Sequence, residues 1–408
     1  MKKIVIIGAG ISGLATAYYL QKLPCEITII EKTDRVGGWI KTIEHEGFCF
    51  ELGPRGFRPQ DLTLALADEV GAKVVDANRA AHKRYLCDGQ KLSPLSFGFL
   101  LKSGMATALL KEWFVKPTQA IDESISSFFS RRFNPKIVDR LIVPMTHGIF
   151  AQEPDRLSMR ACFPALWRME QEHGSLVRAL FKKKRGPKRA ALCSFMGGMQ
   201  ALPDALAHKL ECPILFNEQI QKIDFSEKGA TLELSSKKLE ADHVIAAAPD
   251  PTLEKWLPEA TSLSIVNIGF HTDCLPLNGF GYLNQQIGAD GLLGVTFDSK
   301  IFPELNQSGQ TRLCFMFQGT LTPEQAKSRS SKILQSILKV ERPIDVLHVH
   351  HAKEAIFRYA PGHLQQLQQL EASLPSALTL TGARYYGVGV NDCIARAKSL
   401  ASTLLHNK

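Results

Sequence analysis

The first stretch of the chain that could do chemistry is GAGISG at residues 8–13, a GxGxxG motif. An apolar run precedes it, a helical pattern follows it, and Glu31 ends the next apolar run. Glycines at this spacing let the backbone approach a pyrophosphate, the helix N-terminus stabilises the phosphate charge, and the acid accepts the ribose hydroxyls. An acid here suits a free 2′-hydroxyl and so predicts FAD or NAD, not NADP; the alternative is a tight turn without a nucleotide. The residues expected at this nucleotide are Gly8, Ala9, Gly10, Ile11, Ser12, Gly13, Glu31 and Lys32.

A second glycine pair decides between these two nucleotides. The segment DRVGGWIKT, residues 34–42, resembles the extended flavoprotein signature. In that signature the backbone of Gly37, Gly38 and Trp39 lies against the ribityl chain and pyrophosphate, and Arg35 adds positive charge. No second GxGxxG appears, so we expect no separate NAD(P)H domain. The pattern predicts noncovalent FAD, reoxidised by dioxygen or a quinone.

Two further loops are built from residues that fix backbone geometry. FELGPRGFRP, residues 50–59, combines glycines and prolines with two arginines, so it predicts a stiff cationic loop for a flat or anionic ligand. Near the C-terminus, YYGVGVNDCI places Gly387, Gly389 and Asp392 just before a helix. This indicates a second backbone-donor terminus for the other end of the flavin, although Asp392 could instead be a plain helix cap.

The elements that must position these loops follow from periodicity. Residues 2–7, 12–23 and 25–32 predict a strand, a helix and a strand, which form a βαβ unit. Residues 92–185 are mostly helical by period, with breaks expected at Pro117, Pro144 and Pro164. Residues 262–350 alternate with period two and predict an antiparallel sheet with turns.

Composition limits the class of protein. At ~100–200 residues per domain, 408 residues predict two or three domains. No run of ~20 apolar residues occurs, so no transmembrane helix is expected, and the basic N-terminus leads into the glycine motif and not into a signal-peptide cleavage site. Nine scattered cysteines without a CxxC predict a reducing, cytoplasmic setting and argue against a dithiol–flavin reductase.

The net charge of +9 is unevenly distributed. Residues 89–111 hold three lysines and no acid, and residues 182–189, KKKRGPKR, are nearly all basic. No nucleic-acid-binding motif accompanies them. We therefore expect no nucleic-acid partner and peripheral contact with an anionic membrane surface; the alternative is a solvated loop beside an ordinary core helix.

The motifs together resemble one family. GAGISGLA, DRVGGW, ELGPRGFRP, GIFAQEPDRLSMRACFP, LEADHVIAAAP, NGFGYL, LLGVTFDS and YYGVGVNDCI run end to end like the oxygen-dependent, FAD-containing protoporphyrinogen oxidases, within the wider monoamine oxidase and phytoene desaturase flavoproteins. The resemblance implies that the 53–56 loop lies against the isoalloxazine and that Ile220 contacts the adenine end. The flavin-loop residues it implies are Gly53, Pro54, Arg55, Gly56, Val388, Gly389, Val390 and Asp392.

The resemblance also implies an architecture, a mixed α/β fold with a Rossmann-type FAD-binding domain. That domain would be discontinuous, from residues 1–78, 186–250 and 355–408. Residues 79–90 and 251–354 would form an antiparallel-sheet substrate domain, and residues 91–185 a helical membrane-binding insertion. The oligomeric state stays open.

The tetrapyrrole site is implied in the same way. Apolar positions of the family's substrate sandwich match Phe280, Gly281, Leu283, Leu293 and Met316, although period-two apolar residues also suit plain sheet core. One departure is the family's propionate-pairing arginine, because no arginine occurs between Tyr85 and Ser130. Candidates to replace it are Lys91, Lys102 and Arg84.

The expected reaction is the six-electron oxidation of protoporphyrinogen IX to protoporphyrin IX, with three dioxygen reduced to hydrogen peroxide. We assign no catalytic side chain, because the flavin carries the chemistry, and we expect no metal. The first alternative is a coproporphyrinogen III oxidase acting by the same chemistry. A remote alternative is a Rab-escort-like or GDI-like binding protein, which keeps the GxGxxG without using a flavin.

Overall fold

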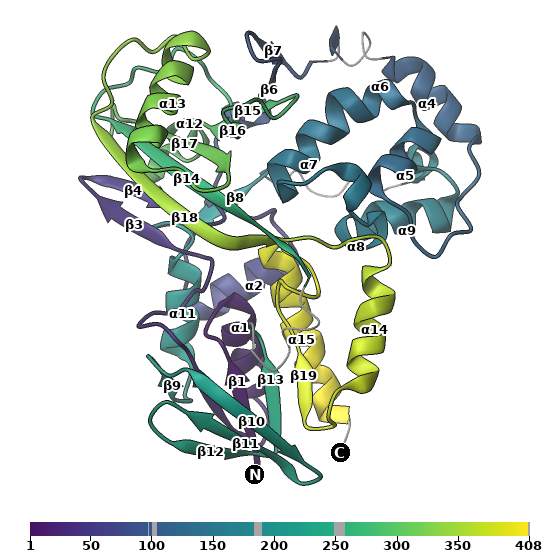
Figure 1. Ribbon diagram of the computed structural model, residues 1–408, viewed down its shortest axis with the longest axis vertical. Helices are drawn as coiled ribbons and strands as arrows, with labels where there is room; N and C mark the ends of the chain where they lie inside the picture. Colours follow the sequence, from purple (N-terminus) through teal and green to yellow (C-terminus); the bar gives the residue numbers. More distant parts are fainter. Residues whose placement is uncertain (97, 100–103, 183–189, 249–257, 407–408) are drawn as a thin grey trace.

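The computed structural model describes residues 1–96, 98–99, 104–182, 190–248 and 258–406 (Figure 1). The expected mixed α/β fold is confirmed. Figure 1 shows both termini at the lower end beside a sheet of short strands, a larger sheet at the upper left, and a group of helices at the upper right. Lys102 and the basic run 183–189 lie outside the described residues.

The lower sheet is parallel, with strand order β19-β13-β1-β2-β9. Alternate residues of β1 face its two sides: Ile4 and Ile6 pack among helices, whereas Val5 and Ile7 pack on a second, antiparallel sheet, β10-β11-β12. The predicted βαβ unit is confirmed. The strands are β1 (Lys2–Ile7), β2 (Cys25–Ile30), β9 (Ile214–Leu215), β10 (Ile220–Ser226), β11 (Gly229–Leu234), β12 (Lys238–Ala241), β13 (His243–Ala246) and β19 (Leu378–Leu380). The helices around them are α1 (Ile11–Leu20), α2 (Asp61–Val70), α11 (Ala201–Lys209), α14 (His363–Ser373) and α15 (Val390–His406).

The upper sheet has the order β18-β14-β17-β16-β15-β6-β7 and is antiparallel except where β15 runs parallel to β6. The prediction of strands throughout 262–350 is wrong over 323–336, where helix α13 covers one face of the sheet. The missed signal was a capping box, in which Thr322 and Gln325 cap the helix reciprocally around a proline at its start. The strands are β6 (Arg84–Cys87), β7 (Leu92–Pro94), β14 (Ala260–Phe270), β15 (Gly281–Asn284), β16 (Leu292–Thr296), β17 (Thr311–Gln318) and β18 (Val346–Phe357). The helices here are α12 (Asp298–Ile301), the 3-10 turn Pro303–Leu305, and α13 (Pro323–Ser336).

The helical group surrounds an aromatic core that contains Phe128 and Trp167. At its centre the fully buried Arg132 is bound by Glu112 and Glu170, so the charge is satisfied within the group. The predicted break at Pro144 is wrong: this residue lies in the first turn of α7, directly after a π-helical turn at Val138–Ile142. The helices are α4 (Met105–Phe114), α5 (Ile125–Arg132), α6 (Pro135–Ile137), α7 (Val143–Phe150), α8 (Met159–Cys162), α9 (Pro164–His173) and α10 (Leu176–Lys182), with a 3-10 turn at Pro154–Arg156.

Two short two-stranded sheets lie between the lower and upper sheets. The hairpin β3 (Thr42–His45) with β4 (Phe48–Glu51) leads into the 53–56 loop, and β5 (Val74–Asp76) pairs with β8 (Cys193–Phe195) before the 3-10 turn Arg79–His82. We propose that the lower sheet with its helices, the upper sheet and the helical group correspond to the FAD-binding domain, the substrate domain and the insertion expected from the sequence. The upper sheet takes in β7, which pairs with β6 beyond the boundary expected at residue 90.

Candidate functional site

The glycine motif forms a cradle at the N-terminus of α1. Gly10 occupies the N-cap position without a side-chain cap, so backbone N–H groups of the first turn remain available. A Cβ on Gly13 would lie 1.9 Å from the carbonyl oxygen of Gly8, whereas a Cβ on Gly10 would meet only the Cα of Gly38, at 3.8 Å. Gly13 is therefore required by packing inside the turn. The open space over Gly10 fits a bound pyrophosphate.

Glu31 stands beside this cradle at the end of β2. It is buried, with 8% exposure; its Oε2 accepts a hydrogen bond from the Ala9 N–H at 2.8 Å, and its Oε1 accepts from the Thr33 N–H at 3.0 Å. These bonds fix the carboxylate next to the glycine turn, where a ribose would lie. Lys32 beside it is exposed, whereas Ile11 and Ser12 are buried in α1.

The second glycine pair folds back on the first. The Gly37 N–H donates to the Ala9 carbonyl at 2.9 Å, which joins the two segments. The Arg35 guanidinium donates to the carbonyls of Val36 at 2.9 Å and Gly38 at 2.6 Å, and desolvation lowers its pKa. Arg35 thus shapes the turn, in addition to the charge that the sequence predicted. Trp39 remains 45% exposed.

The 53–56 loop lies between the lower and upper layers. A Cβ on Gly53 would fall 1.9 Å from the Trp39 carbonyl, which explains the glycine by close backbone approach. Arg55 reaches into the upper layer: its Nε lies 3.4 Å from the Asp298 carboxylate, and its guanidinium contacts the Cys314 sulfur. Arg55 is therefore an anchor of the loop. The Asp298 partner was missed, because nothing in its local sequence points to a residue 243 positions away.

Just before this loop lies a buried acid, Glu51. Its carboxylate accepts hydrogen bonds from the Met199 N–H at 2.8 Å and from the Thr42 hydroxyl at 2.8 Å. Desolvation raises its pKa to about 7. It ties the start of the loop to the segment before α11.

Through Asn391, the C-terminal segment meets the residues that follow the 53–56 loop. The Asn391 amide donates to the carbonyl of Arg58 at 2.9 Å and accepts from the Thr63 hydroxyl at 2.6 Å. Asp392 lies in the first turn of α15 and its carboxylate accepts from the Gly389 N–H at 3.3 Å; desolvation raises its pKa. Asp392 is therefore not the N-cap residue itself, and its contact with the flavin stays a prediction. Val390 is buried in the lower core, Val388 packs against the helical group, and Ile220 shares a core cluster with Ile7 and Ile30.

Tyr359 supports the same loop by two hydrogen bonds and was missed in the sequence. The side chain is 2% exposed, its hydroxyl accepts from the Gly387 N–H at 3.0 Å, and it donates to the Ala383 carbonyl. Its ring stacks on His363 with centroids 4.4 Å apart. A tyrosine in a coil segment carries no local signal of this role.

The residues expected at the tetrapyrrole fall into three places. Leu293 and Met316 share an apolar cluster with Cys314, the residue that contacts Arg55, and so lie next to the flavin loop. Leu283 instead packs against Gly148 of α7, where a Cβ would lie 2.4 Å from the leucine side chain. Phe280 belongs to a different cluster, with Ile301 and Phe302, and Gly281 lies in β15, close against Val295.

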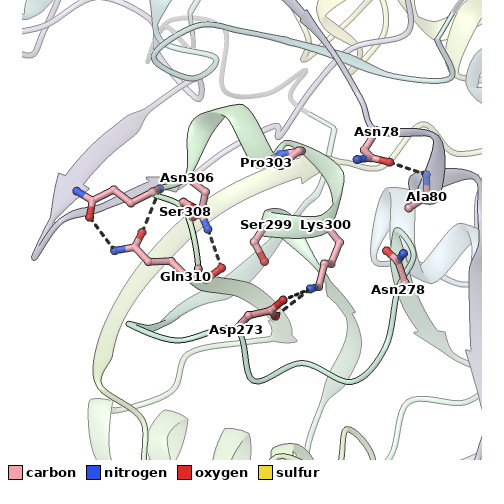
Figure 2. A pocket seen from close by; sticks show the side chains of 12 residues that line it. Asn78, Ala80, Asp273, Asn278, Ser299, Lys300, Pro303, Asn306, Ser308 and Gln310 are labelled. Carbon is pink, nitrogen blue, oxygen red and sulfur yellow. Dashed lines mark hydrogen bonds and ion pairs between the residues drawn. The ribbon is translucent and has the colours of Figure 1, made fainter.

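A polar cavity of about 450 Å³ is lined by a different set of residues (Figure 2). Asp273 and Lys300 form an ion pair of 2.9 Å. Figure 2 shows this pair beside Ser299, with the amides of Asn306 and Gln310 nearby. Its lining includes none of the residues predicted for flavin or tetrapyrrole. Its polar walls do not match an apolar macrocycle.

Two general properties bear on the class of protein. Within the described residues no group of three or more His, Cys, Asp or Glu side chains is placed to hold a metal ion. Across the same part of the chain, no helix has the length and apolar character needed to cross a membrane.

Comparison with known proteins identifies the class. The model of the flavin-containing amine oxidoreductases matches residues 11–405, and the chain belongs to this family of FAD-dependent oxidoreductases. Within it, the chain is 32% identical to the protoporphyrinogen oxidases of Bos taurus and Homo sapiens, over 99% of this chain and 98% of each relative. It is 27% identical to the coproporphyrinogen III oxidase of Bacillus subtilis (strain 168), over 99% of this chain and 98% of that one.

A solved structure agrees with the fold. A crystal structure from Exiguobacterium sp. 255-15, provisionally named a protoporphyrinogen oxidase, superposes with a TM-score of 0.84 at 22% identity, over 100% of this chain and 99% of that one. The predicted family resemblance and the predicted FAD are both confirmed.

Proposed function

We propose that this enzyme carries out the six-electron oxidation of protoporphyrinogen IX to protoporphyrin IX, with dioxygen as the electron acceptor and hydrogen peroxide as the second product. The observation that carries the proposal is the end-to-end similarity to protoporphyrinogen oxidases, together with a nucleotide cradle that fits FAD. Three two-electron cycles consume three dioxygen and release three hydrogen peroxide.

Bound FAD would supply the redox chemistry by taking two electrons per cycle. The protein's part is binding and positioning. The turn at 8–13 and Glu31 would hold the pyrophosphate and ribose, while the 53–56 loop, anchored by Arg55, would hold the ring. No described side chain is assigned as a general base.

The macrocycle would lie beside the cluster of Leu293 and Met316, because this cluster adjoins Arg55 through Cys314. Leu293 is 2% exposed, so it would belong both to the core of the sheet and to the wall of the substrate site, whereas Met316 is partly exposed. An apolar wall of this kind suits the ring faces of a tetrapyrrole, and burial of those faces would supply most of the affinity.

The test is turnover of protoporphyrinogen IX and coproporphyrinogen III side by side, with oxygen uptake, peroxide and porphyrin fluorescence all followed. Three peroxide per porphyrin supports the proposal, and absence of turnover on both substrates rejects it. Preference for the four-carboxylate substrate would instead favour coproporphyrinogen III oxidation, which the Bacillus subtilis relative also suggests.

The cofactor can be checked without substrate. Noncovalent FAD should leave the protein on acid precipitation and appear in the supernatant. A purified protein that has no flavin spectrum and does not bind added FAD would point to the Rab-escort-like alternative.

We also propose peripheral contact with an anionic membrane through helices α4 and α10, which pack against each other. Leu110, Phe114, Leu180 and Phe181 are 63–80% exposed there, and the ring of Trp113 lies 6.0 Å from that of Phe181. The acid of α4, Glu112, is buried, so the charges on this face come from cations such as Lys111, Arg178 and Lys182. Apolar side chains framed by cations suit an anionic bilayer.

This contact is tested by sedimentation with vesicles of anionic or neutral phospholipid. The double variant Phe114→Ser, Phe181→Ser should lose most of its binding to anionic vesicles, while Phe216→Ser, an exposed phenylalanine elsewhere, should not. Equal sedimentation of the double variant and the unaltered protein would remove the idea.

A further inference from the structure

A buried histidine in helix α7 has one ring nitrogen without a partner. His147 is 3% exposed, and its Nε2 lies 2.9 Å from a carboxylate oxygen of Glu153. Its Nδ1 is also buried, and no group in the described part of the chain forms a hydrogen bond with it. Because buried polar atoms are nearly always paired, this nitrogen marks a place where a hydrogen-bonding ligand would fit.

The carboxylate decides which ring nitrogen carries the proton. An ionised carboxylate only accepts hydrogen bonds, so the contact with Glu153 places the proton of the neutral imidazole on Nε2. Nδ1 then has a free lone pair and can accept a hydrogen bond or a proton. The Glu153 side chain is 54% exposed, so water can solvate its charge. A histidine that is oriented by an acid and has its other nitrogen free is the arrangement of many general bases.

The face of α7 that includes His147 borders the proposed substrate wall. Ala151 follows His147 by four residues, and its N–H donates to the His147 carbonyl at 3.0 Å. Residues four apart lie about 40° apart around a helix axis, so these two residues share one face. Ala151 belongs to the apolar cluster that contains Leu293 and Met316. His147 is therefore on the side of the helix that meets this wall.

The same turn of α7 also meets β15 and the C-terminal loop. Gly148, the residue after His147, packs against the Leu283 side chain. Phe150 lies in the aromatic core of the helical group, against which Val388 of the C-terminal loop packs. The turn that holds His147 thus lies where the helical group, the upper sheet and a flavin loop come together.

We propose that Nδ1 of His147 accepts a pyrrole N–H proton of the porphyrinogen, and that Glu153 stabilises the imidazolium that forms. The assignment rests on the proposed function and names a proton acceptor that it left unassigned. Each two-electron step breaks one meso C–H bond and one pyrrole N–H bond. The C–H hydrogen leaves with its electron pair as a hydride to FAD. The N–H electron pair stays on the macrocycle in a new C=N bond, and the proton goes to Nδ1.

The alternative is a core histidine that only ties α7 to the turn containing Glu153. The variant His147→Gln separates the two roles, and His243→Gln is the matched control. His243 is buried in the lower sheet, where its Nε2 lies 2.8 Å from the Thr379 hydroxyl. Each variant is measured for circular dichroism, FAD content and the rate of flavin reduction after anaerobic mixing with protoporphyrinogen IX.

His147→Gln should keep its fold and its FAD but reduce the flavin about a hundredfold more slowly, whereas His243→Gln should react at the normal rate. Glu153→Gln should slow the reaction about tenfold, because an amide no longer fixes the tautomer. Imidazole should restore part of the rate to His147→Ala, and pyrrole, a ring of the same size without a basic nitrogen, should not. A normal rate in His147→Gln, or equal rescue by the two rings, would overturn the proposal.

The contact can also be tested without turnover, because protoporphyrin IX retains two pyrrole N–H groups. In FAD-loaded protein labelled with ¹⁵N-histidine, the Nδ1 resonance of His147 is identified as one that Glu153→Gln also shifts. Protoporphyrin IX should move this resonance; if it does not, the assignment is wrong even where porphyrinogen is oxidised. If the resonance moves but the unaltered protein oxidises no porphyrinogen, the proposed function fails and the His147 contact stands.

Discussion

Replacing Tyr359 by phenylalanine should weaken FAD binding while the apoprotein stays folded. The hydroxyl holds both ends of the C-terminal loop, since it accepts from the Gly387 N–H and donates to the Ala383 carbonyl. The ring itself stacks on His363, and phenylalanine keeps that stacking. The substitution therefore removes two hydrogen bonds to the loop and little else.

The magnitude follows from those two bonds. Each is worth about 0.5–1.5 kcal/mol net, so the loss is about 1–3 kcal/mol. If the whole 1–3 kcal/mol were lost only from the FAD-bound protein, the FAD dissociation constant would rise about 5- to 150-fold. Both loop partners are only half-buried, and the apoprotein loses the same bonds, so part of the loss cancels. We expect a rise of about tenfold, near the lower part of this range.

The assay is titration of the apoprotein with FAD, followed by flavin fluorescence and by the visible spectrum. Tyr386→Phe is the matched control, because its hydroxyl belongs to the same loop but donates to the side chain of Glu371 near the surface. The control should change the dissociation constant less than about twofold, since water can replace an exposed partner. An unchanged FAD affinity and spectrum in Tyr359→Phe, with equal loss of stability in apoprotein and holoprotein, would refute the positioning role.

Three other outcomes are expected. Gly10→Val should give a folded apoprotein that does not bind FAD, whereas Gly13→Ala should unfold more easily even without FAD, because its Cβ would lie 1.9 Å from a carbonyl oxygen; circular dichroism and flavin content distinguish the two. Burial lowers the pKa of His243 to about 4, so between pH 6.5 and 4 the unfolded chain binds a proton that the folded protein does not. The free energy of unfolding should therefore fall by up to about 3 kcal/mol as the pH drops from 6.5 towards 4. Urea titrations of His243→Gln should lack this pH dependence. Arg132→Met should lower the unfolding free energy by about 3–5 kcal/mol, because it leaves the carboxylate of Glu112 buried without its cation, whereas Glu170 keeps Arg131; an unchanged urea midpoint would contradict this.

Local signals explain what the sequence could predict. The βαβ unit, the glycine cradle and Glu31 lie within the first 31 residues, and each depends on neighbours in the chain. Helix α13 was also predictable, since its capping box and first-turn proline stand in the sequence. It was missed because the surrounding apolar residues alternate with period two, and that pattern outweighed the cap.

The partners of the flavin loops could not be predicted in this way. Arg55 meets Asp298, Asn391 meets Arg58, and Tyr359 meets Gly387 across distances in sequence that only the packed fold defines. The sequence located the loops, because glycine, proline and arginine have local meanings. It could not say which of the loop's cations is already neutralised. Arg55 pairs with the Asp298 carboxylate, whereas no residue in the described part of the chain forms an ion pair with Arg58.

The two arginines of this short loop have different environments. The side chain of Arg55 is 12% exposed and paired with Asp298, so its charge is neutralised within the protein and it holds the loop against the upper sheet. Arg58, three residues on, is exposed, and its charge adds to the desolvation that lowers the pKa of Arg84. Between them, Phe57 is buried and exchanges two backbone hydrogen bonds with Cys193, each of 2.8 Å, so the backbone at Arg58 is fixed relative to the 53–56 segment.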